Sequence, residues 1–288
     1  MQELLIWNWR GRDIQLGFDI RGEGPTVVML PALSSISSRS EMHPMSELLS
    51  SSFRCVAVDL PGFGSLPRPP IAWAPDAYRS FVAFILERFS NPFATVAAGH
   101  AAGYLIGHAA GHPGSAGRLC LVAPTWRGPL PTMMGRRHPA FRALSRVVDV
   151  PGLGTALYRL NVNRPMIRMM SLGHVYSDRS WLTAQRFAEK LQVTNAVGAR
   201  HASFRFVAGE LDPMTSRGEF LQAARRVGDP ILVVYGAKTP LRSKSEMQAL
   251  SELPGISSVE LPEGKLGVHE EFPTETAAAI RRFLGAAP

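Results

Sequence analysis

The sequence predicts an α/β protein whose mostly parallel sheet is flanked by helices. Uninterrupted apolar runs of strand length alternate with segments of helix length, and such runs are typical of strands covered on both faces. Strands that alternate with helices favour a parallel sheet with right-handed crossovers. The predicted strands are residues 26–30, 53–60, 94–98, 119–123 and 231–235, with a weaker run at 257–261.

The two ends of the chain predict different elements. After Trp9, apolar and polar residues alternate from Arg10 to Ile20, and residues 21–25 (Arg-Gly-Glu-Gly-Pro) have the composition of a turn. We therefore expect an antiparallel hairpin where the sheet begins. A helix is expected at the other end, from Thr274 to Leu284.

The alternation of strands and helices breaks between Trp126 and about Pro213. Helix-period patterns occur there at 141–148 and 181–191, and no segment has a strand pattern. The sequence predicts a helical cap inserted into an α/β core, with a turn around Asp212 where the cap returns. The expected boundaries are 1–126 and 214–288 for the core and 127–213 for the cap.

The excess positive charge of the chain lies in the predicted cap. Of 31 Lys and Arg and 23 Asp and Glu in the chain, residues 127–205 hold 13 and 3, a net charge of +10. The remainder holds 18 basic and 20 acidic residues, a net charge of −2. One interpretation is a solvated basic face over a methionine-lined pocket. The other is a surface that attracts an anionic membrane or an acidic protein. No nucleic-acid partner is expected, because the basic residues form no known reading motif.

Signatures of several other classes are missing from the sequence. No apolar run approaches the ~18 residues of a membrane helix, and the first residues do not form a signal peptide. We therefore expect a cytoplasmic protein, with peripheral attachment to a membrane left open. Cys55 and Cys120 lie in apolar runs and are expected to be buried, reduced thiols. No zinc, Walker or dinucleotide motif occurs, so neither a metal nor a cofactor is expected.

The segment Gly99-His100-Ala101-Ala102-Gly103 has the frame G-x-S-x-G of a nucleophile elbow, with a predicted strand before it and a helix after it. Ala101 stands where the serine belongs. Because a methyl group can neither attack a substrate nor be activated by a base, the attacking atom of such a site is missing.

From about Gly11 to Leu284, the chain resembles the α/β-hydrolase superfamily, and in particular a branch that lacks the Ser-acid-His triad. The resemblance implies the α/β-hydrolase fold. It rests on four landmarks in the expected order: the run 27–30 leading into Pro31-Ala32-Leu33; Asp-Leu-Pro-Gly-Phe-Gly-Ser at 59–65; the elbow and its continuation to Pro113; and His-Glu-Glu-Phe-Pro at 269–273.

This resemblance also assigns the other two members of the triad. The acid of the superfamily follows the sixth parallel strand in a Gly-x-x-Asp-Pro turn, and Thr239 occupies that position here. The catalytic histidine stands about seven residues before the last proline, which places Leu266 at its position and makes His269 a second histidine. If the loop were three residues shorter, His269 would be the base. Loss of serine and acid together argues that the ordinary serine hydrolase mechanism is absent.

Backbone donors of the site survive the loss of side chains. The resemblance places the oxyanion hole at the N–H groups of Leu33 and Ala102. A helix N-terminus there could still hold a carbonyl or carboxylate group. The residues expected to line the ligand pocket are Leu33, Ser34, Ala101, Ala102, Thr239 and Leu266.

Three hypotheses for function follow from the sequence. The first is a non-hydrolytic protein that binds a small, largely apolar carbonyl or acyl-type ligand under the cap. The second is a lyase, isomerase or water-using hydrolase with His100 or His269 as acid or base, a possibility that the fold alone does not establish. The third is a module that binds a membrane surface or a protein through its basic cap.

Overall fold

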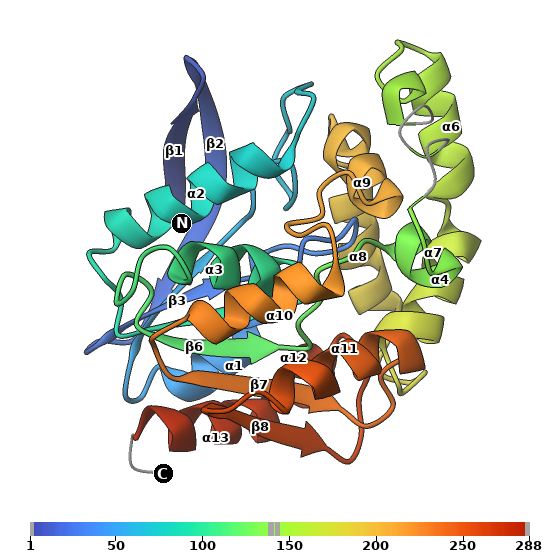
Figure 1. The fold of residues 1–288 in the computed structure, drawn as a ribbon. Coiled ribbons are helices and arrows are strands. Elements are labelled where there is room, and N and C mark those ends of the chain that lie inside the picture. Colours follow the sequence, from blue (N-terminus) through green and yellow to red (C-terminus); the bar gives the residue numbers. More distant parts are fainter. Residues whose placement is uncertain (1–2, 138–140, 142–144, 286–288) are drawn as a thin grey trace.

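A computed structural model describes residues 3–137, 141 and 145–285 of the chain. Within these residues, eight strands form one sheet in the order β1-β2-β4-β3-β5-β6-β7-β8 (Figure 1). β1 and β2 are antiparallel to their neighbours, and the six strands from β3 to β8 run parallel. The strands are β1 (Glu3–Trp9), β2 (Arg12–Arg21), β3 (Thr26–Leu30), β4 (Arg54–Val58), β5 (Ala94–Ala98), β6 (Arg118–Val122), β7 (Ile231–Gly236) and β8 (Ile256–Leu261).

Every apolar run predicted as a strand is a strand of the parallel part of the sheet, which confirms the predicted fold class. β5 lies in the middle of the sheet between β3 and β6, and all five of its residues are buried. Burial on both faces explains why the strands from β3 to β7 show no alternation of apolar and polar residues, whereas β8, at the edge of the sheet, is the weaker run. Both cysteines are buried free thiols on such strands, Cys55 on β4 and Cys120 on β6.

The hairpin at the start of the sheet lies earlier in the chain than predicted. β1 pairs with β2 through a two-residue turn at Arg10 and Gly11, whose φ angles of 50° and 76° are typical of a tight hairpin. The predicted turn at 21–25 instead connects β2 to β3. β1 was not predicted because its residues 4–7 are all apolar and show no alternation. In the structure, Leu5 and Trp7 face the core, whereas Leu4 and Ile6 are exposed.

Helices cover both faces of the sheet. α2 (Pro75–Arg88), α3 (Ala101–Ala109) and α10 (Arg217–Arg226) lie side by side over one face (Figure 1). On the other side, α1 (His43–Leu49) packs against α13 (Pro273–Leu284), which is the helix predicted at the C-terminal end. α11 (Leu241–Ser251) packs beside β7 and β8.

A helical segment, residues 127–213, lies beyond the carboxyl ends of the parallel strands (Figure 1). No described residue of this segment joins the sheet. The predicted helix at 181–191 begins at Ala184, because the hydroxyl of Thr183 accepts a hydrogen bond from the N–H of Arg186 at 3.3 Å. The predicted helix at 141–148 falls partly outside the described residues. The elements are α4 (Pro129–Met134), α6 (Leu153–Asn161), α7 (Arg164–Met170), η2 (Ser171–Val175), α8 (Ala184–Asn195) and α9 (Ala199–Ala208).

A small apolar cluster joins the helical segment to the loop that follows β3. It contains Ile36 from that loop and Ile167, Tyr176, Leu182 and Phe187 from the segment. Packing of this kind buries apolar surface between the two parts of the chain and holds the segment over the sheet. None of the described helices is both long and apolar enough to cross a membrane.

Candidate functional site

The turn between β5 and α3 has its left-handed residue at Gly99. β5 ends at Ala98, Gly99 has a φ of 51°, and Ala101 is already the first residue of α3. The strand before the elbow frame and the helix after it are therefore present as predicted. Gly99 forms the turn between them, and Ala101, at the serine position of the frame, is the first residue of the helix.

The glycine at the end of the sequence frame has a different reason to be small. A Cβ atom on Gly103 would lie only 2.5 Å from Cγ of Pro213, where the helical segment returns to the core. Gly103 therefore permits close packing, whereas Gly99 permits the turn. Both glycines match the motif, but only Gly99 forms the turn between strand and helix.

Gly99 faces the loop that follows β3. A Cβ atom on Gly99 would lie 3.1 Å from Cβ of Ala32. The backbone N–H of Ala32 donates to Oε1 of Glu41 at 2.5 Å, and Glu41 is buried on the short helix η1 (Arg39–Met42). An internal carboxylate thus binds a backbone amide beside the elbow, directly before Leu33.

Glu41 belongs to a buried group of charges that joins the core to the helical segment. His269, on α12 (Val268–Glu271), lies with Nε2 3.5 Å from Oε1 of Glu41. Next to it on α12, Glu270 forms an ion pair of 2.6 Å with Nζ of Lys190 from α8. The hydroxyl of Tyr176 donates to the other oxygen of Glu270 at 2.8 Å. These contacts tie α8 and the residue after η2 to the C-terminal part of the core.

Burial and charge act in opposite directions on Glu41. Burial raises the pKa of its carboxyl group, but His269, Lys190 and the Ala32 amide together outweigh burial and hold the pKa below its usual value. Glu41 is therefore an ionised carboxylate near neutral pH.

A metal ion does not fit this group of residues. Glu41, His269 and Glu270 each offer a ligand atom, and these atoms lie within 4.8 Å of one another. However, the ammonium group of Lys190 already supplies the positive charge at Glu270. A divalent cation bound to Glu270 would take the place of this ammonium as the partner of the carboxylate. The ammonium of Lys190 would still be close by, and electrostatic repulsion between the two positive charges opposes this arrangement.

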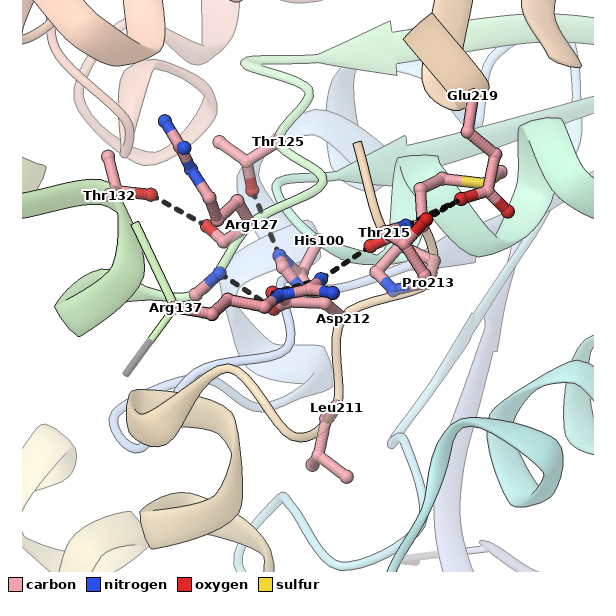
Figure 2. A network of polar contacts seen from close by, with 12 residues as sticks. His100, Thr125, Arg127, Thr132, Arg137, Leu211, Asp212, Pro213, Thr215 and Glu219 are labelled. Atoms are coloured by element: carbon pink, nitrogen blue, oxygen red, sulfur yellow. Dashed lines mark hydrogen bonds and ion pairs between the residues drawn. The ribbon is translucent and has the colours of Figure 1, made fainter. Parts of the chain in front are cut away.

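His100, the residue after Gly99, lies in a second buried network (Figure 2). Its Nε2 is 3.2 Å from Oδ1 of Asp212, and only 1% of either side chain is exposed. The ring packs edge-on against Phe206, and its Nδ1 lies 3.4 Å from the hydroxyl of Thr125. The side chain of His100 is thus surrounded by packed residues of the described part of the chain.

Asp212 is the centre of this network. Its Oδ1 accepts a hydrogen bond from the N–H of Gly128 at 2.7 Å, and its Oδ2 pairs with Arg137 at 2.7 Å (Figure 2). Arg137 also donates to the carbonyl of Met214 at 2.6 Å. Asp212 was predicted only as a turn residue. In the structure it joins the elbow to both ends of the helical segment.

A hollow of about 360 Å³ lies beside Arg137, and sequence reasoning missed it. Its residues come from the loop after β6, the end of α4, the start of α10 and the middle of α11, so no local pattern could have shown that they lie together. The arginines at 127, 136 and 137 were noted only as part of a basic segment. The hollow is lined by Trp126, Arg127, Gly135, Arg136, Arg137, Thr215, Ser216, Arg217 and Glu246.

The residues expected to line the ligand pocket do not line this hollow. Leu33, Ala101, Ala102 and Thr239 are buried, and Ser34 and Leu266 are partly buried. The N–H of Thr239 closes a turn onto the carbonyl of Gly236 at 3.1 Å, and its hydroxyl is buried without a hydrogen bond among the described residues. The N–H of Leu266 donates to the backbone carbonyl of His174, in η2, at 3.4 Å. That these residues form a ligand site stays a prediction.

Comparisons with known proteins agree with the fold, which defines the class as an α/β protein of the hydrolase type. Residues 27–279 match the model of the alpha/beta hydrolase family, and the chain belongs to this family. A search of curated proteins gave no match.

Solved structures with the same fold cover nearly the whole chain. A hydrolase from Pseudomonas aeruginosa is 17% identical, with a TM-score of 0.74 and 98% of each chain covered. A thermophilic esterase from Thermogutta terrifontis is 16% identical, with a TM-score of 0.75, covering 99% of this chain and 98% of its own. The enol-lactonase from Burkholderia xenovorans is 16% identical, with a TM-score of 0.67, covering 94% of this chain and 96% of its own. At these identities the likeness shows the fold alone.

Proposed function

We propose that the chain is a non-hydrolytic member of its family that acts by binding a small ligand. The observation that carries this proposal is the elbow itself, where the turn at Gly99 leads into α3 at Ala101, the position at which the family holds its nucleophile. Gly99 has no side chain, and Ala101 has only a methyl group. Neither residue supplies an attacking atom.

The surroundings of the elbow support the same proposal. Thr239, at the position expected for the acid, cannot stabilise an imidazolium ion by charge as a carboxylate does. The carboxylate of Glu41 lies on the Ala32 amide, close to the loop from which the family builds part of its oxyanion hole. A negative charge there would oppose the oxyanion that develops in ester hydrolysis.

Acid–base catalysis by a histidine has less support. A general acid or base must come within hydrogen-bond reach of its substrate. The imidazole nitrogens of His100 and His269 instead lie near Asp212 and Glu41, in packed protein. Neither histidine lines the hollow beside Arg137.

The ligand that we propose is small and largely apolar, of the carbonyl or acyl type, and binds beneath the helical segment. Leu33, Ala101 and Ala102 offer only aliphatic side chains there, and backbone N–H groups could hold one polar atom of the ligand. Since these residues are buried, binding requires the helical segment to shift.

Identification of molecules that purify with the protein tests this proposal. The wild-type chain is compared with Leu33→Trp, which fills the predicted site, and with Leu4→Trp, which adds the same side chain at an exposed position of β1. We expect mass spectrometry to find a compound that wild type and Leu4→Trp retain and Leu33→Trp loses, with circular dichroism unchanged. Equal recovery from all three folded chains would contradict the proposed site.

A further inference from the structure

The hollow beside Arg137 carries an excess of positive charge. Four arginines, at 127, 136, 137 and 217, line it together with one carboxylate, Glu246. Arg137 pairs with the buried Asp212 at 2.7 Å, and Nε of Arg217 lies 3.4 Å from Glu246. The other two arginines have no carboxylate partner among the described residues. The hollow is therefore suited to an anion.

The two arginines without a carboxylate partner differ in their surroundings. The guanidinium of Arg127 lies over the ring of Trp126, 5.1 Å from its centroid, which holds the group at the wall of the hollow. Arg136 is exposed and has no side-chain partner within the described part of the chain. One guanidinium is thus preorganised and the other is free to reach a ligand. A guanidinium can bind two oxygens of a phosphate at once.

Exposed apolar side chains lie on α4 and α11, the two helices whose residues reach the same hollow at Gly135 and Glu246. Met133 and Met134 end α4 directly before Gly135, a lining residue, and are 51% and 50% exposed. Leu241 begins α11 and is 85% exposed. Arg242 ties the two helices together, because its guanidinium donates to the carbonyls of Thr132, at 2.8 Å, and Met133. We call Met133, Met134 and Leu241 the apolar rim.

We propose that the arginine hollow binds the phosphate of an anionic membrane lipid while the apolar rim inserts between the lipid chains at the bilayer surface. A soluble phosphate compound would explain the arginines but not three exposed apolar side chains beside them, which gain free energy only where they leave water. Basic and apolar groups side by side are the features that bind anionic lipid surfaces. This inference does not depend on the proposed ligand beneath the helical segment.

Sedimentation with lipid vesicles tests the proposal at low salt. We expect the full chain to bind vesicles of equimolar phosphatidylcholine and phosphatidylglycerol, and to bind pure phosphatidylcholine much more weakly. Binding should weaken as salt rises, because salt screens the attraction. Equal binding to both vesicle types, or none to either, would overturn the proposal.

Matched variants separate the hollow from the overall charge. Arg136→Gln with Arg217→Gln should weaken vesicle binding about 25-fold, at about fivefold for each arginine. The control is Arg12→Gln with Arg225→Gln, which removes the same charge from β2 and from the far end of α10. Equal losses in the two double variants would show general attraction only, and would overturn the assignment to the hollow.

The apolar rim has its own matched pair. Met133→Ser with Leu241→Ser should weaken vesicle binding about tenfold. The control, Leu4→Ser with Ile6→Ser, removes exposed apolar side chains from β1 and should leave binding unchanged. Calorimetry with glycerol phosphate distinguishes a soluble ligand from a lipid. If glycerol phosphate binds, Arg136→Gln with Arg217→Gln abolishes it, and vesicles do not bind, the hollow serves a soluble phosphate and the lipid is wrong.

Discussion

The carboxylate of Glu41 accepts a hydrogen bond of 2.5 Å from the backbone N–H of Ala32, beside the turn that Gly99 forms. In a hydrolase of this fold, donors from this loop face the oxygen of the substrate. Here one donor of the loop is bound to the protein's own carboxylate. The region that would otherwise stabilise negative charge is therefore part of a buried ionic cluster, with His269, Glu270 and Lys190 as its other members.

Replacement of Glu41 tests how much this cluster stabilises the fold. At neutral pH, Glu41→Gln should lower the free energy of unfolding by about 3 kcal/mol, because it removes the charge of a buried carboxylate that His269, Lys190 and the Ala32 amide stabilise. Urea unfolding measures the change. Glu47→Gln is the control, since Glu47 is exposed and, within the described part of the chain, pairs only with Arg21, and it should change stability by less than about 1 kcal/mol. Similar effects of both changes would contradict the account.

The pKa of Glu41 also predicts a pH dependence. Because the folded-state pKa lies below the ordinary value of 4.5, the ionised group favours the fold above that pH. Its contribution is lost as the pH falls through the lower folded pKa. We expect the stability difference between wild type and Glu41→Gln to be constant above about pH 5 and to shrink below pH 4.5. A difference that persists at the lowest pH at which both chains fold would be inconsistent with an ionised Glu41.

Asp212 should matter for stability far more than a turn residue does. Asp212→Ala leaves the Gly128 amide and the guanidinium of Arg137 without their acceptor. We therefore expect the free energy of unfolding, measured in urea, to fall by about 3 kcal/mol. Asp229→Ala is the matched change, because Asp229 also accepts a backbone hydrogen bond, from Gly114 at 2.9 Å, but at an exposed position. Equal losses would show that Asp212 is not the centre of a buried network.

The position of the elbow turn can be tested with alanine. Gly99→Ala places a Cβ atom at a φ of 51° and 3.1 Å from Cβ of Ala32, and should destabilise the chain by about 1–2 kcal/mol. Gly218→Ala should have the opposite sign, a gain of up to about 1 kcal/mol, because Gly218 lies within α10 without a positive φ or a close neighbour. Thermal unfolding distinguishes the two. A neutral Gly99→Ala would place the turn elsewhere.

Both thiols should be inert in the folded chain. Burial raises the pKa of Cys55 to about 12 and raises that of Cys120 further, so neither forms the reactive thiolate at pH 8. We expect an aromatic disulfide reagent to modify neither cysteine of the native protein and both after unfolding in urea. Rapid modification of the native chain would show that β4 or β6 opens easily.

The sequence predicted those parts of the fold that depend on local pattern. The run 94–98 became β5 without change, because a buried strand needs only apolar side chains on both faces. β1 was missed because Leu4 and Ile6 are apolar although they are exposed. The motif did not show that its two glycines have different roles, because Gly99 forms the turn whereas Gly103 is small for its packing against Pro213.

The polar groups of the site were harder to predict, since they depend on contacts between distant segments. Glu41 and Lys190 are separated by most of the helical segment and the first half of the core, yet both belong to the cluster around His269. Arg137 and Arg217 likewise line one hollow only because α4 ends near the place where α10 begins. The charge excess of residues 127–205 was visible in the sequence, but the hollow that concentrates it was not.

Ester turnover tests the central claim most directly. The purified chain is assayed at neutral pH with p-nitrophenyl acetate and butyrate, beside His269→Gln, Thr239→Ala and an equal concentration of unfolded wild type. We expect folded wild type and both variants to release p-nitrophenol at the same slow, non-saturating rate, because no side chain at the elbow can attack, and the unfolded chain to show only the non-saturating background of its exposed nucleophiles. A saturable rate for folded wild type that either variant loses would contradict it, and would show a working hydrolytic site.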